Sequence, residues 1–142
     1  MKITLLFLSA AALAFVAFAL WVRLAPASPA RWHGDPATAP DPQRPHFARA
    51  ERVLPLPPAA VRAGLDAIAA AEGAAVLADE GLHVTYVART RLMRFPDFVS
   101  IRLDDQGDGT TRLRALSRAR FGYSDMGLNA GRLKRWLARL ED

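Results

Sequence analysis

The sequence contains no cysteine, and only two of its 19 basic residues are lysines. The absence of cysteine excludes disulfides and thiolate metal sites, although it does not fix the compartment. No nucleophile elbow, phosphate-binding glycine loop or cluster of metal-ligating residues is present either. We therefore expect no cofactor and no metal. A length of 142 residues allows one compact domain and a short appendage.

Charged residues are also missing from residues 3–22, where Leu, Phe, Ala and Val dominate. A run of this length crosses a bilayer core as a helix, and Trp21 and Arg23 at its end suit the headgroup region. We assign residues 1–24 as a membrane anchor. A cleaved signal peptide is the alternative, because Ala17-Phe18-Ala19 and Ala25-Pro26-Ala27 place small residues at the spacing a signal peptidase uses.

The orientation of this anchor depends on its flanking charges. Lys2 precedes the apolar run, whereas Arg23 and Arg31 follow it, so a literal charge count places the rest of the chain in the cytoplasm. A two-residue tail before an apolar run nevertheless resembles an export signal, whose tail stays inside. We favour a domain on the exported, periplasmic side, with a cleaved periplasmic form as the alternative.

The net charge of +5 falls to +3 when Lys2 and Arg23 are set aside, since 17 basic and 14 acidic residues are left. This excess is too small to indicate nucleic acid, which we do not expect as a partner. The strong preference for arginine suits bidentate recognition of anions. Codon bias in an alanine-rich chain explains the same preference.

Residues 25–45 carry six prolines and almost no apolar periodicity. This composition predicts a semi-rigid linker that holds a domain at 46–142 away from the membrane. Trp32 and His33 interrupt the linker, and we expect them to dock on the domain or to rest at the lipid interface. A lone histidine is not expected to bind a metal.

Within 46–142, hydrophobic periodicity predicts an α+β domain. It consists of a small antiparallel sheet of four to five strands packed by two helices, and the transmembrane helix precedes it. Apolar stripes at helical spacing indicate helices over 57–72 and 129–140, although the second is also compatible with a basic helix on a membrane surface. Alternating patterns and turn residues indicate the strands, over 49–54, 76–77, 82–89, 99–103 and 113–119.

The last two strands form a hairpin whose register follows from its core residues. If Leu103 and Leu113 share the core face, Asp104 lies opposite Arg112, and Arg102 lies opposite Arg114. Residues 89–120 hold eight arginines and four acidic residues, so this sheet is the best candidate for an anionic partner. A solvated outer face kept soluble by its charge is the alternative. The candidate anion-binding residues are Arg102, Arg114, Arg118, Arg120 and Arg132.

The segment "SRARFGYSDMGLNAGR", from Ser117 to Arg132, gathers turn-forming and charged residues before the last helix. Asn129 is a suitable N-cap, and Asp125 can form an Asx turn. Gly122 and Gly127 allow the chain to leave the strand with positive φ. These roles are structural, and they leave Arg120 and Arg132 unexplained.

The same segment resembles the C-terminal signature of domain-of-unknown-function family 1499. The family pattern falls on Arg120, Gly122, Asp125, Gly127, Asn129 and Arg132, with Ala119 where the family usually has Ser. Phe95-Pro96-Asp97 is similar to a second family segment, and the resemblance covers about 46–142. It implies an α+β domain in exported, often membrane-tethered proteins, and it brings no assigned activity or catalytic residues.

Three functions compete on this basis. The first is a tethered, non-catalytic module whose arginines bind an anionic lipid, a glycan acid or a protein carboxylate. The second is a structural or assembly subunit that contacts another envelope protein. The third, which we rank last, is a hydrolase that uses Asp125 with Ser124 or His83.

Overall fold

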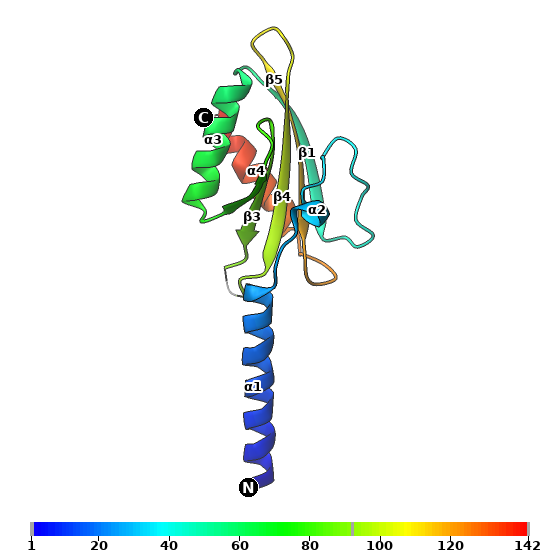
Figure 1. Ribbon diagram of the computed structural model, residues 1–142, viewed down its shortest axis with the longest axis vertical. Helices are drawn as coiled ribbons and strands as arrows, with labels where there is room; N and C mark the ends of the chain where they lie inside the picture. The colour runs from blue at the N-terminus through cyan, green and yellow to red at the C-terminus, as the bar shows by residue number, and fades with distance from the viewer. Residues whose placement is uncertain (1, 92, 142) are drawn as a thin grey trace.

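The computed structural model describes residues 2–91 and 93–141, which form the predicted α+β fold behind an N-terminal apolar helix (Figure 1). The described elements are, in chain order, α1 (Lys2–Leu24), α2 (Pro29–Trp32), β1 (Phe47–Leu54), α3 (Pro58–Ala71), β2 (Ala75–Asp79), β3 (His83–Arg89), β4 (Pro96–Asp105), β5 (Thr111–Ala119) and α4 (Leu128–Glu141).

The five strands form one antiparallel sheet in the order β1-β5-β4-β3-β2. The predicted register of the β4–β5 hairpin is confirmed, because Asp104 pairs with Arg112 and Arg102 pairs with Arg114. Asp104 lies between the two facing guanidinium groups, with its carboxylate oxygens 2.9 Å from Arg114 Nη1 and 3.4 Å from Arg102 Nε. This carboxylate offsets the repulsion that two facing arginines would otherwise produce.

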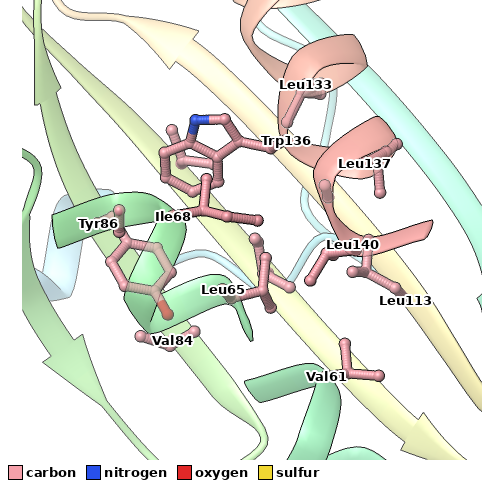
Figure 2. Packing of buried hydrophobic residues seen from close by; sticks show 14 of the residues in the cluster. Val61, Leu65, Ile68, Val84, Tyr86, Leu113, Leu133, Trp136, Leu137 and Leu140 are labelled. Carbon is pink, nitrogen blue, oxygen red and sulfur yellow. The ribbon is translucent and has the colours of Figure 1, made fainter. Parts of the chain in front are cut away.

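Helices α3 and α4 cover one face of the sheet (Figure 1) and bury the predicted apolar stripes there. The packed side chains include Val61, Leu65, Ile68, Leu133, Trp136, Leu137 and Leu140 (Figure 2). Trp136 meets Tyr86 of β3 edge to face, with the ring centroids 5.6 Å apart. The Tyr86 hydroxyl donates to Asp66 Oδ1 at 2.6 Å, so its polar end is satisfied. Helix α4 therefore packs on the sheet, as the favoured interpretation expected.

The opposite face of the sheet, here called the outer face, is covered by the chain between α1 and β1. Trp32 stacks on Phe98 of β4 with the ring centroids 4.2 Å apart and the planes at 14°. The Trp32 carbonyl accepts hydrogen bonds from Ser100 Oγ at 3.2 Å and Arg118 Nη2 at 3.0 Å. Residues 26–45 thus lie across the sheet and differ from the spacer expected for 25–45. We call them the strap.

Helix α1 leads directly into one end of the sheet, where β3 ends and β4 begins (Figure 1). We call this the basal end. Val22 is fully buried, the ring of Phe18 lies 6.3 Å from that of Phe95, and Trp21 lies 5.2 Å from Phe121. Residues Ile3–Leu24 are long and apolar enough to cross a membrane, and a signal sequence shares this property.

Replacing Trp32 with alanine tests whether the strap belongs to the folded unit. Trp32 is 9% exposed, so W32A should lower the free energy of unfolding by about 3 kcal/mol, as is usual when a buried tryptophan is removed. Urea unfolding of the full chain in neutral detergent measures this change. Y123A is the matched control, because Tyr123 is 73% exposed and should change stability by less than about 0.5 kcal/mol. Equal, small effects of both variants would show that the strap does not stabilise the domain.

Candidate functional site

The connection from β5 to α4 is organised by Asp125. Its Oδ1 accepts from the Gly127 N–H at 3.1 Å, and its Oδ2 accepts from the backbone N–H and side-chain amide of Asn129 at 2.9 and 2.7 Å. The prediction that Asn129 is the N-cap is therefore wrong, because α4 already begins at Leu128 and Asp125 satisfies its first turn. Gly122 and Gly127 have φ of 92° and 80°, as the predicted turn requires.

Hydrogen bonding also sets the ionisation of this capping carboxyl. Burial raises the pKa of Asp125, but the hydrogen bonds donated by Asn129 and Gly127 outweigh burial and leave the pKa below its usual value. Asp125 is therefore charged at neutral pH and is engaged with the helix terminus. This arrangement is the one expected of a structural cap.

Arg132 is buried and holds a second part of the motif together. Its Nη2 lies 2.8 Å from Asp97 Oδ2, and its Nη1 donates to Asn129 Oδ1 at 3.0 Å. Ser117 of β5 also donates to Asn129 Oδ1, so the network joins β4, β5 and α4. Burial raises the pKa of Asp97, and the attraction and hydrogen bond of Arg132 oppose that rise. The charge of Arg132 is thus compensated inside the protein.

The other four candidate arginines lie on the outer face, and each contacts an acidic side chain or the chain that leaves α1. Arg102 pairs with Asp35 of the strap at 3.1 Å, and Arg114 pairs with Asp104. Arg118 donates to the Arg31 and Trp32 carbonyls, and Arg120 donates to the Ala25 and Pro26 carbonyls. The structure does not gather the five predicted residues into one anion site.

The residues of the hydrolase hypothesis are also separated. His83 begins β3, and its pairing partner is Arg102, whereas Arg89 at the other end of β3 pairs with Pro96 at the basal end. Six residues of strand place these two ends about 20 Å apart. Ser124 and Asp125 belong to the basal end, since the nearby Arg120 N–H donates to the Pro96 carbonyl. The fold therefore does not bring His83 to Ser124 or Asp125.

A cavity of about 780 Å³ opens at the basal end, between the β3–β4 connection and the start of α4. We call it the basal pocket. Its described lining is largely apolar with arginines among it, and consists of Glu72, Ala88, Arg89, Thr90, Arg91, Met93, Phe95, Met126, Leu128, Arg132 and Arg135. Phe95 is shared between this lining and the contact with Phe18 of α1. The pocket therefore lies beside the end of the apolar helix.

The arginines of the basal pocket differ in how they are held. Arg89 is fixed by the Arg94 and Arg23 carbonyls, at 3.0 and 3.3 Å, and Arg132 is paired with Asp97. Arg91 is exposed, and Arg135 has only a 3.9 Å contact with Glu72, the acidic residue of the lining. Arg91 and Arg135 are therefore the lining arginines most available to a ligand. Sequence reasoning missed both, because the pocket forms only when α4 meets the β3–β4 connection.

A separate cluster lies on the outer face, where His33 and His83 stack with ring centroids 3.8 Å apart. Glu80 is close to both, with Oε2 at 3.7 Å from His33 Nε2 and 3.8 Å from His83 Nδ1. The expectation that His33 is a lone histidine is thus overturned. The sequence holds little indication of this cluster, because residues 33 and 83 come together only when the strap docks on the sheet.

The fold defines a small α+β domain whose sheet is covered on both faces and whose basal end adjoins an apolar N-terminal helix. A family model described as "Protein of unknown function (DUF1499)" matches residues 22–140, so the chain belongs to this family. The matched region begins at the buried Val22 and includes the whole strap.

Further comparisons add little. A search of curated proteins gives no match. Among solved structures, the crystal structure of TTHA0849 from Thermus thermophilus is similar, with 18% sequence identity and a TM-score of 0.34. The similarity covers 67% of this chain and 94% of that one.

Removing the charge of Arg132 should show how much the unpaired, buried Asp97 carboxylate destabilises the fold. R132M should lower the free energy of unfolding by about 3–5 kcal/mol at neutral pH, because a buried carboxylate loses its partner. Without Arg132 the pKa of Asp97 rises further, so the carboxyl protonates in the folded state and the loss should shrink as the pH falls toward 5. Urea unfolding at pH 8 and pH 5 measures both effects. R135M on the same helix is the control, and an equal loss in both variants would contradict the structural role of the pair.

Proposed function

We propose that this protein is a membrane-tethered, non-catalytic binding module that holds an anionic phospholipid in the basal pocket. The observation that carries the proposal is the position of an apolar, arginine-containing pocket beside the end of an apolar helix long enough to span a bilayer. We place the domain on the exported side, with helix α1 uncleaved.

Contacts between α1 and the domain support an uncleaved anchor. Val22 has no exposed surface, and Trp21 and Phe18 pack against rings of the basal end. Cleavage at Ala25-Pro26-Ala27 would remove all three of these residues from the fold. Arg89 also donates to the Arg23 carbonyl at 3.3 Å, which ties the end of α1 to the pocket lining.

The location of the pocket favours a lipid over a soluble anion. If α1 spans the bilayer, its last turns and the neighbouring Phe95 lie at the level of the headgroups, where aromatic residues are favoured. Met93, Met126 and Leu128 give the pocket an apolar lining suited to an acyl chain. Arg91 and Arg135 lie in the same lining and can bind a phosphate through charge-assisted hydrogen bonds.

The outer face is the less suitable place for an anion. Arg118 and Arg120 already donate to backbone carbonyls at the start of the strap, and Arg102 is paired with Asp35. An anion there would have to displace these contacts. Within the described residues, Arg91 has no such contact to give up, and Arg135 would give up only its 3.9 Å contact with Glu72.

Native mass spectrometry of the full chain in neutral detergent tests the proposal. The chain should bind one phosphatidylglycerol more tightly than phosphatidylcholine with the same acyl chains. In the R91Q/R135Q double variant the affinity for phosphatidylglycerol should fall about 30-fold, since each arginine near an anionic headgroup contributes about 1 kcal/mol. Binding of phosphatidylcholine should not change.

R44Q/R52Q is the matched control, because both arginines are exposed and lie outside the pocket lining. Equal affinity for the two lipids, or an equal loss in the control variant, would contradict the proposal. Cross-linking from position 123 in intact membranes adds a second readout. A discrete protein adduct without selective lipid binding would favour the assembly subunit instead.

A further inference from the structure

We propose that His33, Glu80 and His83 form a binding site for one divalent transition-metal ion, with zinc as the test ion, and that the ion fastens the strap to the sheet. This site lies on the outer face and is independent of the basal pocket. It joins two segments that are 47 residues apart in the chain, from residue 33 to residue 80.

Two local structures position the three side chains. Glu80 and His83 belong to the β2–β3 hairpin, in which the Glu80 N–H donates to the His83 carbonyl at 2.8 Å. His33 follows α2 and is held because the neighbouring Trp32 is stacked on Phe98. One ligand atom from each residue lies within 4.8 Å of the other two.

The ligand distances are close to those a metal requires. Ligands bound tetrahedrally at about 2.1 Å lie about 3.4 Å from one another. The distances from Glu80 Oε2 to His33 Nε2 and His83 Nδ1 are 3.7 and 3.8 Å. The stacked rings are inclined by only 16°, so one imidazole has to turn about its side-chain bonds when both lone pairs bind one ion. Two imidazoles and a carboxylate leave a fourth position for water.

A chain of hydrogen bonds fixes the tautomer of His33. The Trp32 carbonyl can only accept, so Ser100 Oγ donates to it, at 3.2 Å. Thr85 Oγ1 then donates to Ser100 Oγ at 2.9 Å, and His33 Nδ1 donates to Thr85 Oγ1 at 2.7 Å. The proton is therefore on Nδ1, and His33 Nε2 presents its lone pair to Glu80. Metal-binding histidines are held in this way by a hydrogen bond from the other ring nitrogen.

The lone pair of His33 Nε2 is buried and accepts no hydrogen bond from the described residues. The His33 side chain is 8% exposed, and its Nε2 has no hydrogen-bond partner within the described part of the chain. His83 is also 8% exposed and retains one buried nitrogen, Nε2, without a described partner.

The charged groups around the cluster leave Glu80 as the available carboxylate. Arg62 engages both carboxylate oxygens of Asp79, at 2.9 and 2.7 Å. Arg102, the pairing partner of His83, is itself paired with Asp35 and Asp104. The Glu80 side chain is 71% exposed, and within residues 2–91 and 93–141 its ion-pair contacts are the two long ones with the histidines, so it can turn onto an ion.

Isothermal titration of the untagged full chain in neutral detergent with Zn²⁺ tests the site. We expect one equivalent of bound zinc and X-ray absorption showing a nitrogen and oxygen shell at about 2.0–2.1 Å. The melting temperature should rise by about 5 °C or more at a hundredfold excess over the Kd. H33Q, H83Q and E80Q should each weaken binding about 100-fold or more, and T85V about 10-fold, because Thr85 orients His33.

The sequence supplies a matched control, because its third histidine, His46, lies outside the cluster. H46Q should leave zinc affinity unchanged. E80Q alters an exposed side chain and so keeps the test decisive even if a histidine variant fails to fold. Absence of saturable binding, or equal affinity in E80Q and the unaltered chain, would overturn the proposal. Loss of binding in H46Q would overturn it as well.

Discussion

The rest of this structure depends on the docking of Trp32 against Phe98. An antiparallel sheet commonly leaves one face to water, and its strands then alternate between buried and exposed residues. Here β4 is buried continuously from Pro96 to Ile101, so its second face needs a cover. The strap provides that cover without adding a strand. The stacked Trp32 fixes the position of the strap, and the Arg31 and Trp32 carbonyls then accept hydrogen bonds from Arg118 of the sheet.

Docking of the strap also explains a structural role for the abundant arginines. The segment from residue 25 to residue 45 contains six prolines and therefore has six fewer backbone N–H groups than carbonyls. Arg49, Arg118 and Arg120 donate to five of these carbonyls in addition to that of Trp32, on Ala25, Pro26, Arg31, Pro36 and Ala39. A guanidinium group has several donors in a fixed geometry, so it can bind two neighbouring carbonyls where lysine offers a point charge. Among the arginines that line the basal pocket, Arg89 donates to two carbonyls, whereas Arg91 and Arg135 donate to none within the described residues.

The sequence predicted the elements whose stability is local. The apolar stripe of α3, the shared core face of Leu103 and Leu113, and the resulting Arg102–Arg114 pairing all follow from periodicity within short segments. The strap was harder to predict, since its docking depends on isolated aromatic residues without periodicity. The sequence did indicate that the outer face is covered, because Phe98 and Leu116 lie on it and a face exposed to solvent usually carries polar residues at such positions.

The candidate sites were less predictable for the same physical reason. The Asp97–Arg132 pair and the His33–Glu80–His83 cluster each join residues that are far apart in the chain and meet only through tertiary packing. Asp125 and Asn129 lie four residues apart, yet which of them caps α4 was decided by where the helix begins. Boundaries of this kind shift by one or two residues with tertiary context, and sequence patterns do not fix them.

Hydrogen exchange of the strap amides in the full chain tests the central claim most directly, namely that residues 26–45 are part of the folded domain. The N–H groups of Trp32, His33 and Ala39 donate to carbonyls within the strap. If the strap is docked, these amides should exchange on the order of 100-fold or more slowly than in an unfolded peptide. Exchange at the unfolded rate, while the amides of β4 stay protected, would show that the segment is a free linker and would contradict the account.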